Sequence, residues 1–278
     1  MPNNETVKMH PVQMAKEALS LWGANIIPLV AISATIALAH KAFGVVLYST
    51  GPIQEAMKSG EINLTASLLF GVFVLVSFVV NCFLSLVAIN TLRRRVEKKS
   101  FLFEAFKDAA RRAVPFLKSI FFIFGFVLVG IFVALSFLAG GKAVYALAAK
   151  SLGHGLALGA LLATSTVFVV LAIGVAWYGF FFSLAPLVAA YENIPAFNSL
   201  RASRDRVRGN ALRYLGAMAI FVGAYFIVGL AIYGVIIRFT HDKYILNLID
   251  PALLLFFGPL GLSIWYVSYK KLTQIKVS

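Results

Sequence analysis

The residues best suited to metal or acid–base chemistry are few in this chain of 278 residues, and they are scattered along it. Its four histidines are His10, His40, His154 and His241. His40, His154 and His241 fall at the ends of long apolar segments or between them, where they could meet Asp242 as a metal site. However, no two histidines are spaced i, i+4, and the pattern HExxH is absent. We therefore favour histidines at membrane boundaries over a metal site.

Signatures of other enzyme classes are also absent from the sequence. There is no G-x-S-x-G pattern and no Walker sequence, and Gly140–Lys142 (GGK) lacks the upstream glycine of a phosphate-binding loop. The single cysteine, Cys82, lies in an apolar run, so neither a disulfide framework nor a thiolate metal site is expected. We expect a protein that is not an enzyme and that needs no cofactor.

A few uncharged polar residues interrupt the apolar segments and could line a path for a small molecule. They include Asn81, Asn90 and Thr166. Asn81 and Asn90 are nine residues apart and therefore lie on opposite faces of a helix. Proton-coupled transport usually depends on Asp, Glu or His inside the membrane, and the apolar segments lack these except at their ends. Hydrogen bonding between helices is the favoured interpretation.

The elements that would position these residues are long apolar helices. Only 13% of the residues are charged, compared with about 25% in an ordinary soluble domain. A hydrocarbon core about 30 Å thick is crossed by about 20 mainly apolar residues. Charge-free runs of that length predict six spans, at about 21–40, 66–91, 117–139, 158–183, 214–237 and 251–269. Ala37–Ala39 resembles a signal cleavage site, but the long polar segment before the first span favours an uncleaved helix.

The 25 Lys and Arg residues, against 11 Asp and Glu, are concentrated on one predicted side of the membrane. Most occur in the N-terminal segment, in the loops after spans two and four, and at the C-terminus. The positive-inside rule therefore predicts that both termini and both basic loops are cytoplasmic. An even number of spans also places both termini on one side. Nucleic-acid binding is not expected, because no folded basic domain with base-stacking aromatic residues is present.

Three of these basic segments, all except the C-terminus, also contain a predicted amphipathic helix. In residues 100–113, Leu102, Phe106, Ala109 and Ala113 share one face, and charged residues occupy the other. Such a helix is expected to lie at the membrane interface with its apolar face in the lipid, before Pro115 turns the chain into span three. A second helix follows Asn193, which is predicted to cap it. A third begins at Pro11.

This order of elements occurs three times. The segments EALSLWGANIIPL (17–29) and EAFKDAARRAVPF (104–116) carry the same Glu-Ala and Pro spacing. We predict an all-α, polytopic membrane protein of three helical hairpins, each preceded by an amphipathic cytoplasmic helix. The chain forms one membrane domain, 1–278, with pseudo-repeats at about 11–92, 100–190 and 194–270. Close helix contacts are predicted at two stripes rich in small residues: Gly155, Gly159 and Ala163, and Gly216, Ala217, Ile220 and Gly223.

The segment from Ser183 to Gly216 resembles a group of six-helix bacterial membrane proteins. That group includes the membrane-anchor domain of some glycerophosphodiester phosphodiesterases and several uncharacterised inner-membrane families. The matching positions are Pro186, Glu192, Ser203, Arg208, Gly209 and Asn210, and the segment Lys16–Asn25 resembles the group's N-terminal surface helix. The resemblance implies a bacterial inner-membrane fold. It implies no reaction, because in that group the catalytic part is a separate soluble domain.

These expectations favour a scaffold, envelope-maintenance or lipid-associated factor. Its basic helices would contact anionic lipid headgroups, and the contacts are predicted at Arg111, Arg112, Arg201, Arg204 and Arg208. A second membrane protein or a second copy of the chain stays open as a partner. The alternative is a transporter or channel for small molecules or lipids, with a path near Asn81, Asn90 and Thr166.

Overall fold

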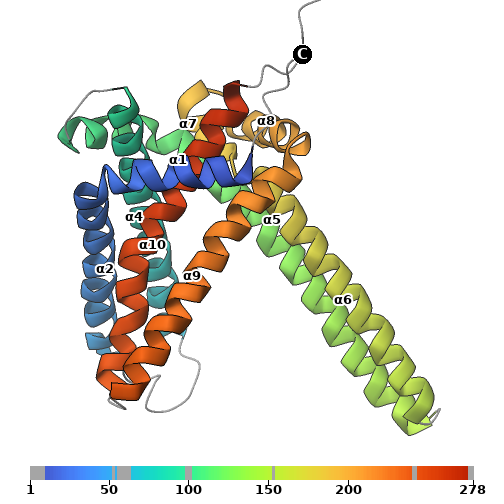
Figure 1. Cartoon of the computed structure of the whole chain (residues 1–278). Helices are drawn as coiled ribbons and strands as arrows, with labels where there is room; N and C mark the ends of the chain where they lie inside the picture. The colour runs from blue at the N-terminus through green and yellow to red at the C-terminus, as the bar shows by residue number, and fades with distance from the viewer. Residues whose placement is uncertain are drawn as a thin grey trace, which may run out of the picture. The chain divides into compact units, whose positions relative to one another are not determined.

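The computed structural model describes residues 10–51, 54, 64–97, 102–151, 154–239 and 243–274. These residues are helical almost throughout, and no strand occurs among them (Figure 1). The chain divides into two compact units. The first comprises 1–117 together with 210–278, and the second comprises Lys118–Gly209.

Five helical segments in the described part of the chain are long and apolar enough to cross a membrane. They are Ile26–Val46, Leu64–Val96, Leu102–Leu147, Ala157–Glu192 and Ala211–Arg238. This confirms that the described residues are helical and membrane-like. The five segments overlap the first five predicted spans, but the first begins at Ile26 and not near residue 21. The sixth predicted span, 251–269, lies in a continuous helix, α10 (Lys243–Gln274), and its crossing stays a prediction.

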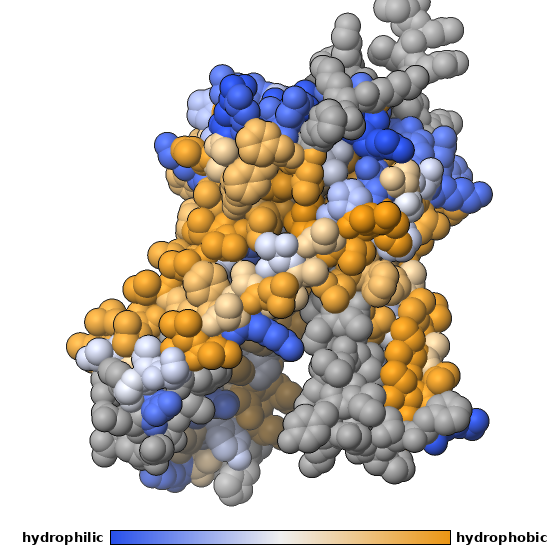
Figure 2. All heavy atoms as spheres, turned by 90° about the vertical axis from the view of Figure 1, so that its left-hand side faces the viewer, coloured by the Kyte–Doolittle hydropathy of each residue, from blue (hydrophilic) through white to orange (hydrophobic). Residues whose placement is uncertain are grey.

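The first unit is built on α4 (Leu64–Val96) and α10. Helix α2 (Ile26–Ser49) packs against both of them, and α10 also packs against α9 (Ala211–Phe239). The buried residues of α4 are concentrated toward its C-terminal end, from Leu86 to Leu92. The other end of α4 carries exposed apolar side chains such as Phe70, and hydrophobic side chains cover much of the face shown in Figure 2. Such a surface is suited to a hydrocarbon solvent.

The short helix α1 (Pro11–Gly23) lies against α9 and α10. Its apolar residues Met14 and Ala18 are buried, and Glu17 forms an ion pair with Lys271 of α10 at 2.8 Å. A Cβ atom at Gly216 of α9 would come within 3.1 Å of Pro11. The predicted start of the helix at Pro11 is confirmed. Its apolar stripe is covered by protein and is not available to lipid.

Helix α5 (Leu102–Ser151) corrects two expectations. It runs without interruption through Pro115, so the predicted surface helix and span three form one helix of 50 residues. Proline removes one backbone hydrogen bond and disfavours a regular helix, but it does not end this one. The helix also continues through Gly140 and Gly141, which lie in the gap between predicted spans three and four.

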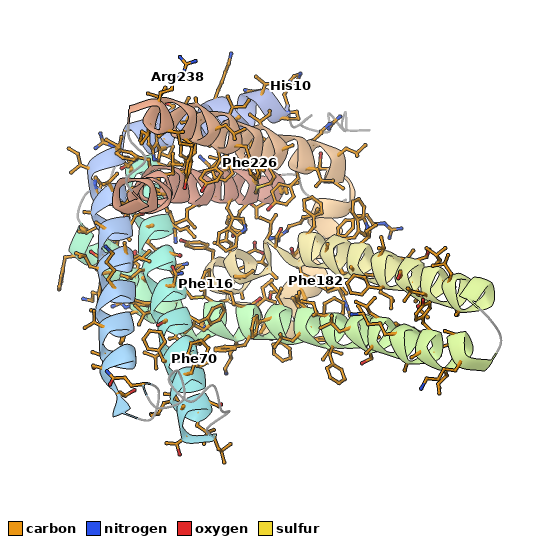
Figure 3. The ribbon with its side chains drawn as sticks, turned by 90° about the horizontal axis from the view of Figure 1, so that it is seen from below. His10, Phe70, Phe116, Phe182, Phe226 and Arg238 are labelled. Carbon is orange, nitrogen blue, oxygen red and sulfur yellow. The ribbon has the colours of Figure 1, made fainter. Side chains whose placement is uncertain are left out.

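In the second unit, the part of α5 that follows Leu117 runs antiparallel to α6 (His154–Phe182), as Figures 1 and 3 both show. Two glycines of α5 set the register. A Cβ atom at Gly130 would lie 2.3 Å from Cγ2 of Val175, and one at Gly141 would lie 1.9 Å from Oγ1 of Thr164. Phe182, labelled in Figure 3, contacts the ring of Phe126 edge-on, with centroids 5.7 Å apart. Glycine therefore permits the close approach of the two backbones.

The predicted glycine stripe of span four is wrong, because Gly155 and Gly159 of α6 face open space. The stripe of span five is right in part. Gly216 makes the contact with Pro11 described above and Ala217 is buried, whereas Gly223 faces open space. The sequence therefore indicated that glycine is used at helix contacts. In the α5–α6 pair, however, the contacts are made by glycines of α5 and not by the predicted glycines of α6.

Helix α6 ends in a turn at Ser183–Leu184, and the short helix α7 (Ala185–Glu192) follows. Pro186 lies at the start of α7, where its missing N–H costs nothing. Helix α8 (Ala196–Arg208) begins after Pro195. Asn193 was expected to cap α8, but it ends α7 in the left-handed conformation, with φ 53°. Asparagine is one of the few residues that tolerate this conformation.

Candidate functional site

The most chemically distinctive part of the second unit is α8. Its small side chains Ser199, Ser203 and Val207 are buried and form one stripe. The Ser203 hydroxyl donates a hydrogen bond to the carbonyl of Phe181 at 2.7 Å, and the hydroxyls of Ser199 and Ser119 are 3.1 Å apart. The Phe181 carbonyl lies where α6 breaks, so Ser203 satisfies an acceptor that the helix end leaves unpaired. Thus α8 is fixed to the α5–α6 pair through polar contacts.

A bidentate ion pair fixes α8 to α7. Nη1 and Nη2 of Arg206 donate to the two carboxylate oxygens of Glu192, the second pair of atoms being 2.6 Å apart. Both side chains are mostly buried, which shields the pair from water and makes it stronger than an exposed one. Arg206 is therefore a structural residue. Together with Ser199, Ser203 and Val207, it fixes the inward-facing side of α8 to the rest of the unit.

The outward-facing side of α8 carries an aromatic residue followed by cations. Phe197, Arg201, Arg204 and Arg208 follow the spacing i, i+4, i+7, i+11 and are all exposed, with Phe197 at 61%. The guanidinium of Arg201 lies over the Phe197 ring, 5.9 Å from its centroid. Arg204 forms an exposed pair with Asp205 at 3.1 Å, which contributes little stability in water. We name this row of four residues the α8 stripe.

The first unit has a similar helix in the opening part of α5. Arg94 of α4 holds it in place by ion pairs with Glu104 and with Asp108, the latter at 2.9 Å. Ala105 and Ala109 are buried, and this corrects the expectation that the Ala109 side of the helix enters lipid. Phe103 is 78% exposed, and Lys107 and Arg111 are also exposed. Arg112 is half-buried.

The predicted headgroup residues therefore fall into two groups. Arg201, Arg204 and Arg208 lie together on the α8 stripe in the second unit, and Arg111 and Arg112 lie on α5 in the first unit. Four of the five are exposed, and each group lies on a helix whose other side is buried. This arrangement suits phosphate recognition, because the guanidinium group presents a planar array of donors.

The three residues predicted to line a polar path belong to different units of the structure. Asn81, which is half-buried, and Asn90, which is buried, lie on α4 in the first unit. Thr166 lies on α6 in the second unit, is exposed, and donates to the carbonyl of Leu162 in its own helix at 2.9 Å. The prediction of a hydrogen bond between helices at Thr166 is therefore wrong, because the Thr166 hydroxyl bonds within α6. A path through these three residues stays a prediction.

The histidine site cannot be assembled from the described residues. His241 and Asp242 lie outside them, as do the side chains of His40 and His154. Where side chains are described, no group of three potential metal ligands occurs.

Two functional features were not predicted from the sequence. Phe197 could have been found from its spacing, because it stands four residues before Arg201 on a charged helix. The Arg206–Glu192 pair joins two helices across a bend, and no spacing rule within one helix reveals it.

Comparisons with protein-family models, with curated proteins and with solved structures give no match for this chain. The assignment of function therefore depends on the geometry of the two basic helices and on the apolar helices that carry them.

Proposed function

We propose that this chain is a non-enzymatic integral protein of a bacterial inner membrane that binds anionic lipid headgroups through its basic surface helices. In this proposal it crosses the bilayer six times as three hairpins, with both termini, α1, α8 and the opening part of α5 on the cytoplasmic side. It acts as a lipid-associated scaffold or accessory factor of the envelope. The resemblance of the sequence to the membrane-anchor group named above supports a role without a reaction.

The observation that supports the proposal most directly is that the two sides of α8 differ: one contacts the protein and the other is exposed. Its inner side is occupied by Ser199, Ser203 and Arg206, so the helix has a fixed orientation. Its outer side presents the α8 stripe, in which one aromatic ring and three guanidinium groups point away from the protein core. Basic residues near the membrane surface are attracted to anionic lipids, and the planar guanidinium group is suited to binding phosphate.

The opening part of α5 supports the same function. Phe103 and Lys107 repeat the i, i+4 pairing of Phe197 and Arg201, and both are exposed. Near a surface rich in anionic lipid, each basic residue contributes about 1 kcal/mol of attraction. Several such residues give selectivity for anionic headgroups without a deep binding pocket.

The double variant Arg201→Gln, Arg208→Gln tests the proposal. Binding of phosphatidylglycerol to the purified chain in detergent is measured by native mass spectrometry at low salt. Its apparent affinity is expected to fall roughly tenfold, because about 1 kcal/mol per charge is partly screened. Binding of phosphatidylcholine is expected to stay unchanged, since its headgroup has no net charge.

The matched control is Lys142→Gln, Lys150→Gln, which removes two exposed positive charges near the other end of α5. This variant is expected to bind phosphatidylglycerol like the unmodified chain. An equal loss in both variants would show that net charge alone governs binding, and no loss in the arginine variant would reject the α8 stripe as the contact.

A further inference from the structure

The second unit contains an apolar groove between α5 and α6. Its volume is about 300 Å³, and it is bounded by the stretch Val127–Leu135 on α5 and the stretch Phe168–Gly179 on α6. Every lining residue is glycine or has a purely hydrocarbon side chain. A polar ligand would lose its hydrogen bonds to water there and gain none, so the groove is suited only to an apolar occupant.

Small residues create the groove within a close helix pair. Gly130 and Gly141 bring α5 against Val175 and Thr164 of α6. Between and beside these contacts, Ala134, Ala172 and Gly179 do not fill the space between the helices. Close backbone approach combined with short side chains thus leaves a groove along the pair.

The groove lies at the depth of the hydrocarbon interior. Along α5 the nearest charged residues are Lys118 and Lys142. Ile131, in the middle of the α5 lining, is about 20 Å from the first and about 17 Å from the second along the helix axis, at 1.5 Å per residue. A hydrocarbon core about 30 Å thick has its centre about 15 Å from either surface. Charged residues therefore flank the groove at the distances expected of the two membrane surfaces.

The width of the groove selects the kind of occupant. The two helices that form it are in contact, Gly130 against Val175 and Gly141 against Thr164. A helix with side chains is about 10–12 Å in diameter, so it cannot enter between two helices that touch. A hydrocarbon chain is much thinner, and it can lie along the α5 lining, which is about 12 Å long.

We infer that the groove between α5 and α6 binds one acyl chain of a membrane phospholipid. The chain lies along the small residues of the pair and completes their packing. The site is separate from the α8 stripe, because it recognises the tail of the lipid and not its headgroup.

Photolabelling in nanodiscs tests this inference. The full chain is placed in phosphatidylcholine discs containing a tracer phosphatidylcholine with a diazirine in the middle of one acyl chain. After irradiation, labelled peptides are quantified by mass spectrometry. Labelling at Ala134, which is 2% exposed, is expected to exceed, by fivefold or more, that at Val129 and Phe132, which lie at the same depth but are 65% and 73% exposed. Equal labelling of the three positions, or weaker labelling at Ala134, would mean ordinary surrounding lipid and would overturn the inference.

The variant Gly179→Leu fills the groove. A Cβ at this position would meet Val127 only at 3.9 Å, an ordinary contact, so the fold is expected to survive. Labelling at Ala134 should fall at least fivefold. Gly174→Leu is the matched control, because its Cβ points into open space on the same helix, and it should leave labelling unchanged. If Gly179→Leu does not fold, Ala172→Leu replaces it, with labelling read at Ala134.

Unchanged labelling in the filled variant, or a cross-link joining two copies of the chain through the groove, would reject the acyl chain as occupant. Because the discs contain only zwitterionic lipid, a failure here leaves the headgroup proposal intact. The result for the arginine variant likewise does not affect the inference about the groove.

Discussion

Replacing Gly141 by valine is expected to lower the free energy of unfolding by about 3 kcal/mol, at the upper end of the range for overpacked sites. A Cβ atom at this position would lie 1.9 Å from Oγ1 and 2.5 Å from Cβ of Thr164. Because the Cβ of Thr164 is held by its backbone, a change of rotamer cannot relieve the clash. The two helices must separate, and the melting temperature in detergent should fall by several degrees.

Gly140→Val provides the matched control for this prediction. Gly140 is the adjacent residue of the same helix, but its Cβ would meet nothing within 4 Å. Valine is a better helix former than glycine, so this variant should be neutral or slightly stabilising. Adding Thr164→Gly to Gly141→Val should restore part of the lost stability. Equal melting temperatures of the two valine variants would contradict the α5–α6 register.

Ser203→Ala is expected to destabilise the chain by about 2 kcal/mol. The substitution removes the donor that bonds the carbonyl of Phe181 at 2.7 Å, in a position with no solvent exposure. Loss of the donor from this partly buried bond leaves the Phe181 acceptor unpaired, which costs about 1–3 kcal/mol. Since this bond also joins α8 to α6, its loss should increase proteolysis at the α7–α8 connection. Both effects can be followed by thermal unfolding and limited proteolysis in detergent.

Ser136→Ala is the control, because Ser136 is exposed and bonds only the carbonyl of Phe132 in its own helix, at 2.9 Å. Loss of that bond should change stability by less than about 0.5 kcal/mol. If Ser203→Ala and Ser136→Ala behaved alike, the bond to Phe181 would not be what fixes α8.

The sequence predicts the positions of the apolar helices well, because charge is excluded from hydrocarbon whatever the tertiary contacts are. Pro11 was correctly placed at the start of α1, since proline lacks the N–H that a first turn leaves unpaired. In α8, Ser203 and Val207 are four residues apart and are both buried, as the helical period requires of one face. These features depend on local periodicity.

Features that depend on partners far along the chain were not predictable in the same way. Asparagine is a common N-cap residue, so Asn193 was expected to cap α8. It instead ends α7, because the break after α7 requires a residue in the left-handed conformation. Pro115 reads as a helix boundary, yet α5 continues through it. Gly141 could not be matched with Thr164 without the register of two helices.

The candidate site shows the same division. Exposure of Arg201, Arg204 and Arg208 followed from their spacing. The spacing did not reveal that Arg206 differs from these three arginines. Arg206 pairs with Glu192 of α7, and this contact depends on the bend between α7 and α8. Helices α1 and α8 each have 13 residues and are each followed by a two-residue turn ending in asparagine, Asn25 and Asn210. The pseudo-repeat itself stays a prediction.

The proposed function requires that the opening part of α5 and helix α8 share one side of the membrane. This is tested by single cysteines placed at Ala110, Asn198 or Ala143, all exposed, after Cys82 has been changed to alanine. An impermeant maleimide is applied to right-side-out and inverted membrane vesicles. We predict labelling of the first two positions only in inverted vesicles, and of the third only in right-side-out vesicles. Labelling of Ala110→Cys and Asn198→Cys in opposite preparations would contradict the account.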